Sequence, residues 1–221
     1  MTMKAISYEE ARPLMKPGDV IAFGGKGQLS EIIKFATHSA VSHVGVILQT
    51  KVVDDLTGRF FNQIIESTSL HGFNGVTVSR FSDRLTDYDG EIWWLPLSQG
   101  LWQQKFDRKA FYDFLFNQAK ERKPYDMPQA INSALDHLDS LPGGLHGANY
   151  NKEDFSRFFC SELAAAGLEK SGAIPRVNAS EVTPIDLCRW NIYDPEYYLL
   201  KGDDSKRIKG FNSLAPGLWD I

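Results

Sequence analysis

Short, mainly apolar stretches run through the first half of the chain, and stretches of this length between turns are typical of β-strands. These stretches are rich in β-branched residues, and polar turns such as Lys16-Pro17-Gly18-Asp19 separate them. Because successive strands are joined by short turns, we expect an antiparallel meander. The expected strands cover residues 20–23, 43–49, 63–68, 75–79 and 91–95, and a late strand at 197–200 closes the sheet.

Apolar residues recur with a helical period in the second half of the chain. Phe106, Ala110 and Phe114 lie along one side of a helix. Asp126 and Gln129 form a capping box at the start of another helix, which ends before a proline and two glycines. Strands followed by helices predict an α+β fold, and a length of 221 residues fits one domain over 1–221. The expected helices cover 30–35, 106–122, 126–141 and 158–170, and a short one carries Cys188.

Composition and charge exclude several classes of protein. The net charge is −4, and the basic residues are scattered along the sequence. We therefore expect no positive patch that would attract nucleic acid or an anionic membrane. No apolar window of about 18 residues is present, so we expect no transmembrane segment. Residues 1–11 lack the apolar core of a secretory signal, which predicts synthesis in the cytoplasm with reduced thiols. Export by a route that needs no signal peptide stays open.

Cys160 is the first candidate for chemistry, because it falls near the start of the helix expected at 158–170. Asp154 and Ser156 are candidate N-caps upstream of it. The positive end of a helix dipole favours a thiolate, and such positions lower the pKa of a thiol from about 8.5 to roughly 3.5–7.5. A buried core cysteine is the other interpretation, and position alone leaves both open.

His43 is the candidate base, on the strand expected at 43–49. His43 and Gly45 share a face of that strand, so Gly45 is expected to leave an open patch beside the imidazole. A catalytic histidine needs an orienting group on its second ring nitrogen. Glu66 on the next strand is the best choice, because an unpaired carboxylate in such an apolar run would be costly. The alternative is that Glu66 faces water from an edge strand; Asp54, Asp55 and His71 are weaker candidates for the orienting role.

Other residues and motifs give weaker indications of a function. Tyr125 is a candidate oxyanion donor, together with the backbone N–H of Cys160, or else it anchors a loop. Cys188 lies among apolar residues and reads as structural. No Gly-Lys-Ser/Thr sequence follows the glycine-rich loop at 24–27, so we do not expect this loop to bind phosphate. No ligand pair has the short spacing of a zinc site, and we expect neither a metal nor another cofactor.

Taken together, these short motifs resemble the circularly permuted papain-like group of the NlpC superfamily, of the YiiX/YaeF type. The resemblance runs from about residue 16 to about residue 190, with histidine ahead of cysteine in the chain. It implies an antiparallel sheet packed against the cysteine helix and a triad of Cys160, His43 and Glu66. The motifs are Lys16-Pro17-Gly18-Asp19-Val20-Ile21, Ser42-His43-Val44-Gly45-Val46, Ile65-Glu66-Ser67 followed by Gly75-Val76, Pro124-Tyr125-Asp126 and Phe159-Cys160-Ser161-Glu162-Leu163.

The resemblance also implies a class of reaction. Members of the group are regarded as amidases or peptidases, often of cell-wall peptides, and some are suspected of acting on lipids or acyl groups. We therefore expect a cysteine hydrolase that cleaves an amide bond in a peptide, a peptidoglycan fragment or another acyl-amide. The alternatives are a thioesterase, lipid amidase or acyltransferase that uses the same cysteine, and a catalytically inactive binding domain. The chain departs from the group in its long segment at 127–157 and in its lack of a signal peptide.

Overall fold

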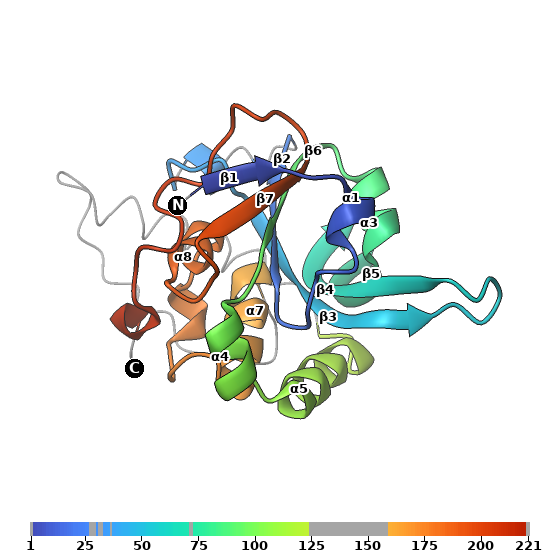
Figure 1. The fold of residues 1–221 in the computed structure, drawn as a ribbon. Helices are drawn as coiled ribbons and strands as arrows, with labels where there is room; N and C mark the ends of the chain where they lie inside the picture. The colour runs from blue at the N-terminus through green and yellow to red at the C-terminus, as the bar shows by residue number, and fades with distance from the viewer. Residues whose placement is uncertain are drawn as a thin grey trace.

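A seven-stranded sheet lies at the centre of the computed structural model, which describes residues 2–26, 30, 33–35, 37–70, 73–123 and 159–219 (Figure 1). The strand order is β1-β7-β6-β2-β3-β4-β5. The edge pair β1 and β7 is parallel, and every other neighbouring pair is antiparallel. The strands are β1 (Thr2–Ala5), β2 (Val20–Gly25), β3 (His43–Val53), β4 (Phe60–Leu70), β5 (Phe73–Arg80), β6 (Gly90–Leu95) and β7 (Glu196–Lys201).

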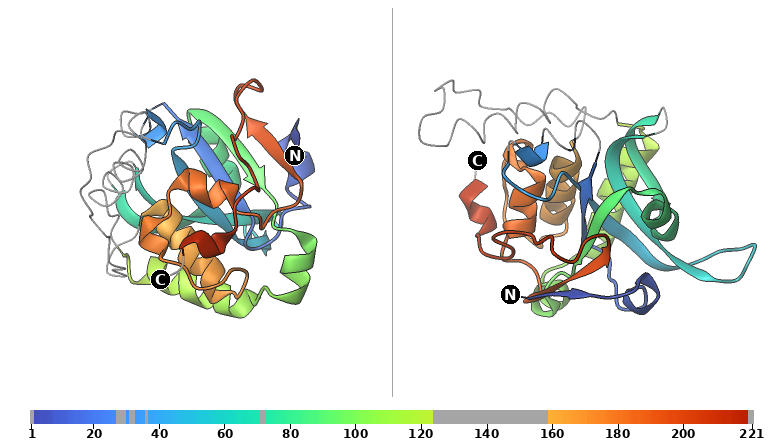
Figure 2. Two further views of the ribbon diagram at one scale, coloured as in Figure 1. Left: turned by 90° about the vertical axis from the view of Figure 1, so that its left-hand side faces the viewer. Right: turned by 90° about the horizontal axis from the view of Figure 1, so that it is seen from above.

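Helices cover both faces of the sheet, as the views of Figure 2 show. On one face, α7 packs against β3 and β4, and α5 packs against α7 and β5. On the other face, Tyr8 of α1 and Phe81 of α3 join a smaller apolar cluster with Ile21, Ile47 and Ile64. The helices are α1 (Tyr8–Ala11), α3 (Phe81–Asp87), α4 (Gln99–Gln104), α5 (Arg108–Lys120), α7 (Cys160–Lys170) and α8 (Pro184–Arg189), with short 3₁₀ turns η1 (Ala179–Glu181) and η2 (Pro216–Trp219).

The α+β class and the packing of a largely antiparallel sheet against the cysteine helix are confirmed. The expected meander holds for β3, β4 and β5, but β6 crosses over to pair with β2. Elements β1, α1, α3 and α4 were not expected, because each is too short to show a hydrophobic period. The helix expected at 126–141 lies outside the described residues, and the one expected at 30–35 lies partly outside them.

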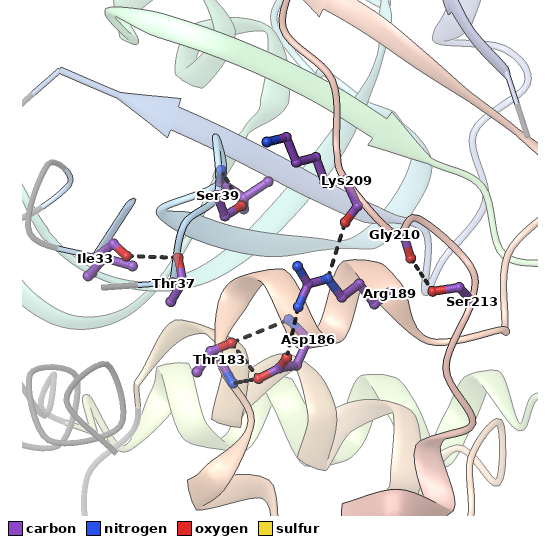
Figure 3. A network of polar contacts seen from close by, with 10 residues as sticks. Ile33, Thr37, Ser39, Thr183, Asp186, Arg189, Lys209, Gly210 and Ser213 are labelled. Carbon is purple, nitrogen blue, oxygen red and sulfur yellow. Dashed lines mark hydrogen bonds and ion pairs between the residues drawn. The ribbon is translucent and has the colours of Figure 1, made fainter. Parts of the chain in front are cut away.

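Hydrogen bonds join the C-terminal segment of the chain to α8 (Figure 3). Thr183 caps this helix, since its hydroxyl accepts the N–H of Asp186 at 3.3 Å. Arg189 donates from Nε to the carbonyl of Lys209 at 3.1 Å, and its own carbonyl accepts the N–H of Ser213. These bonds hold the C-terminal segment against α8, where Cys188 is fully buried. No helix in the described part of the chain has the length and apolar character needed to cross a membrane.

Candidate active site

Cys160 is the first residue of α7, and its side chain is buried at 1% exposure. The N-cap is Phe159, whose backbone N–H donates to Glu162 Oε2 at 3.2 Å. The expectation that Asp154 or Ser156 caps this helix is therefore wrong, and both residues lie outside the described part of the chain. The placement of the cysteine in the first turn is as expected, so its sulfur sits at the positive end of the helix.

Small residues explain how α7 fits into the core. Every residue from Cys160 to Leu168 is buried, including three successive alanines. At Gly167, a Cβ atom would lie 3.0 Å from the side chain of Leu115 on α5. Glycine at this position therefore allows close packing between two helices, and the position of Cys160 is set by the core of the molecule.

His43 begins β3 and links the cysteine to a carboxylate. Its Nε2 lies 2.6 Å from Glu66 Oε2 on β4, and the imidazole also interacts with Cys160. Phe23, its partner on β2, packs beside the imidazole with ring centroids 5.3 Å apart. Burial alone would lower the pKa of His43, but the interactions with Cys160 and Glu66 outweigh burial and raise it to about 9. The imidazole is therefore held as a cation at neutral pH.

Glu66 is buried at 1% exposure on β4, an inner strand between β3 and β5. The alternative in which Glu66 faces water from an edge strand is therefore wrong. Its Oε1 accepts the Nε–H of Arg84 at 2.7 Å, and its Oε2 accepts an Nη2–H of the same residue at 3.2 Å. Burial opposes ionisation, but the hydrogen bonds and charges of His43 and Arg84 hold the pKa of Glu66 below its ordinary value.

Arg84 is the site residue that the sequence did not reveal. It lies on α3, and its side chain is only 10% exposed. The guanidinium stacks at 4.9 Å from the ring centroid of Phe23 and 4.7 Å from that of Tyr88. The sequence could have indicated that such a residue exists, because a buried carboxylate with only one histidine beside it needs a further cation or hydrogen-bond donor. Cys160, His43, Glu66 and Arg84 thus form a continuous row of groups from α7 to α3.

The open patch expected beside His43 is absent. A Cβ atom on Gly45 would lie 2.9 Å from Ile64 Cδ1 and 3.1 Å from the carbonyl oxygen of Ile65. The space next to Gly45 is therefore filled by β4, and the glycine allows that strand to approach. This prediction is wrong because it considered one strand without the side chains of its neighbour.

The remaining candidates lie elsewhere. Tyr125 and His71 fall outside the described residues. Asp54 is bound to Arg80 at 2.6 Å and accepts the N–H of Leu56 at 2.9 Å, so it stabilises the turn between β3 and β4. Within the described ranges, no three side chains of His, Cys, Asp or Glu are grouped as metal ligands would be.

No family model matches the chain, and no curated protein matches it either. Among solved structures, the chain is similar to the metalloprotein yiiX from Escherichia coli O157:H7 (DUF1105). The TM-score is 0.47 and the sequence identity is 16%, over 74% of this chain and 69% of that one. At this level of similarity, only the chain's own geometry bears on its chemistry.

Proposed function

We propose that this protein is a papain-like cysteine hydrolase of amide bonds, of the permuted NlpC type. The observation that carries the proposal is that Cys160, at the first position of α7, interacts with an imidazole whose Nε2 is held by Glu66. A nucleophile, a base and an orienting group in this order form the general arrangement of a thiol hydrolase.

The proposed reaction begins when the Cys160 thiolate attacks the carbonyl carbon of the amide. His43 then gives its proton to the departing amine, and the C–N bond breaks to leave an acyl group on sulfur. In the second half, His43 takes a proton from water, and the resulting hydroxide displaces the acyl group as a carboxylic acid, which restores the thiolate of Cys160 and the imidazolium of His43. Glu66 keeps the imidazole in position and stabilises its cationic form.

The oxyanion of the intermediate needs hydrogen-bond donors. The backbone N–H of Cys160 lies in the first turn of α7, where N–H groups have no acceptor within the helix. We assign Tyr125 as the second donor on the strength of the Pro124-Tyr125-Asp126 motif. The substrate class is a peptide or peptidoglycan fragment, and an acyl-transfer reaction would use the same cysteine.

The direct test is a panel of short peptides, peptidoglycan fragments and acyl thioesters, offered to the purified protein and analysed by mass spectrometry. Release of an amine and a carboxylic acid supports amide hydrolysis. An acyl group that stays on Cys160, or moves to an added acceptor, indicates an acyltransferase instead. The Cys188→Ala variant is the matched control, because Cys188 is buried and burial raises the pKa of its thiol. It should retain the turnover of the wild type.

Alkylation by iodoacetamide tests the activated thiol without a substrate. We expect iodoacetamide to modify Cys160 at pH 7 and to react much more slowly with His43→Ala, because the imidazole activates the sulfur as a nucleophile. Since the pKa of His43 is raised to about 9, the imidazolium persists up to about that pH. Burial slows access to Cys160 in both proteins, so the diagnostic measurement is the ratio of the two rates rather than either absolute rate. Equal rates in the wild type and His43→Ala would contradict the proposal.

A further inference from the structure

A cavity lies along β3 at a distance from the row of groups at Cys160. It encloses about 700 Å³ between the turn at residues 13–17, residues 48–52 of β3 and the helices α4 and α5. This volume lies within the range of small-molecule sites. Its wall begins five residues beyond His43 on the same strand, which is about 16 Å at 3.3 Å per residue. The cavity is therefore separate from the proposed active site.

Three cations line this cavity, and none of its lining residues is acidic. They are Lys16, Lys51 and Arg108, and they stand out in a chain whose net charge is −4. Within the described residues, neither Lys51 nor Arg108 forms an ion pair. Lys16 is partly compensated, because its ammonium donates to the carbonyl of Leu97 at 3.4 Å and interacts with the buried Asp19. Asp107 caps α5, and Asp113 pairs with Lys109.

An aromatic platform fixes two of the cations. The Arg108 guanidinium lies 4.0 Å from the ring centroid of Trp102, and Lys16 Nζ lies 5.6 Å from it. The indole N–H of Trp102 donates to the carbonyl of Pro17 at 3.0 Å, which holds the ring in place. Stacking on an aromatic face leaves the edge N–H groups of a guanidinium available to an anion. The charges are thus positioned in advance of any ligand.

Lys51 reaches the same cavity through an irregular strand. Its φ is 57°, a left-handed conformation that is unfavourable for lysine, and the register of β3 against β4 shifts between Gln49 and Val52. Bulges of this kind redirect a side chain, and they are frequent beside binding sites. Retained strain at a lysine that lines a cationic cavity is consistent with a functional role for its ammonium group.

We propose that this cavity binds the phosphate group of an organic phosphate monoester. Two lysines and an arginine match a dianion, and arginine can bind two phosphate oxygens at once. The apolar side chains of Pro13, Leu14 and Pro17 line the same cavity and contact the organic part of the ligand. The proposal does not depend on the function assigned to Cys160.

Two sources can supply such a group, a free metabolite or a lipid headgroup. The lipid source is suggested by the hairpin of β3 and β4, which projects from the body (Figure 1). Its end carries exposed apolar side chains, at 52% for Val53, 95% for Leu56 and 57% for Phe60. Within this turn, Asp54 accepts the N–H groups of Leu56 and Thr57.

The first arm of the test titrates n-butyl phosphate into the full chain and follows the indole N–H resonance of Trp102 by NMR, assigned with a Trp102→Phe variant. We expect a saturable shift in the wild type. The Lys51→Asn/Arg108→Gln variant should bind at least about tenfold more weakly, which is about 1.4 kcal/mol. Asparagine accepts the left-handed backbone at position 51. The matched control is Lys120→Gln, an exposed charge in the last turn of α5 that lies outside the cavity and should leave affinity unchanged.

The second arm measures cosedimentation with phosphatidylcholine vesicles, with and without phosphatidic acid. Binding that requires phosphatidic acid and is lost in both Lys51→Asn/Arg108→Gln and Leu56→Ser/Phe60→Ser supports the lipid source. Binding of butyl phosphate alone supports a free metabolite. The proposal is overturned if butyl phosphate gives no saturable shift up to about 10 mM, or if the charge variant binds as the wild type does. It is equally overturned if only the apolar hairpin variant affects vesicle binding and butyl phosphate does not bind.

Discussion

Replacing Cys160 by alanine should reduce amide hydrolysis by at least about 10³-fold, because no other group in the row can form the acyl intermediate. His43→Ala should fall to a similar level, and the double variant should be no worse, since the two residues act as one unit. The measurement is turnover of any substrate that the panel identifies, at saturating concentration and neutral pH.

The experiment must distinguish activity lost through unfolding from activity lost with the nucleophile, because Cys160 belongs to the main apolar core. Cys160→Ser keeps the size of the side chain and removes most of its nucleophilicity, so it should retain the thermal transition of the wild type while losing activity. Full activity in a folded Cys160→Ser or Cys160→Ala protein would refute the proposed mechanism and direct attention to other residues.

Replacing Arg84 by glutamine should lower the free energy of unfolding by about 3 kcal/mol, since it leaves a buried carboxylate with one cation fewer. For a chain of this size, that loss corresponds to a decrease in Tm of about 6–12 °C. The matched control is Arg80→Gln. Arg80 also forms an ion pair at 2.6 Å, but its side chain is 44% exposed, so its loss should be below about 1 kcal/mol.

The loss of stability caused by Arg84→Gln should also become smaller as the pH falls. The pKa of Glu66 is lowered in the folded state from its ordinary value of 4.5 by His43 and Arg84, which outweigh burial. Its contribution to stability is therefore complete above about pH 4.5 and is lost as the pH falls through the lowered pKa. The difference in Tm between wild type and Arg84→Gln should shrink over that acidic range. Equal effects of the Arg84 and Arg80 variants at pH 7 would argue against a buried ion network.

The contacts that were predictable from the sequence are those set by strand adjacency and helix position. His43 and Glu66 lie on consecutive strands, so their contact follows once β3 and β4 pair. Cys160 precedes a run of small apolar residues, and the start of a helix there was visible in the pattern. The catalytic role of these residues stays a prediction.

The missed features depend on contacts between elements that are distant in the chain or too short to have a pattern. Arg84 comes from α3, a helix of seven residues with one buried position, Phe81. The space beside Gly45 depends on Ile64, a residue that only the register of β3 and β4 brings near. The pairing of β6 with β2 likewise depends on the packing of Trp93 and Trp94 rather than on a turn signal.

The complete burial of α7 from Cys160 to Leu168 has a consequence for how the protein loses the geometry around Cys160. A helix on the surface can fray and re-form while the rest of the molecule stays intact. Opening α7 exposes the main core, so its amide hydrogens exchange with solvent mainly when the whole molecule opens. The cysteine thus belongs to the slowest-exchanging part of the protein, and loss of its geometry on heating coincides with global unfolding.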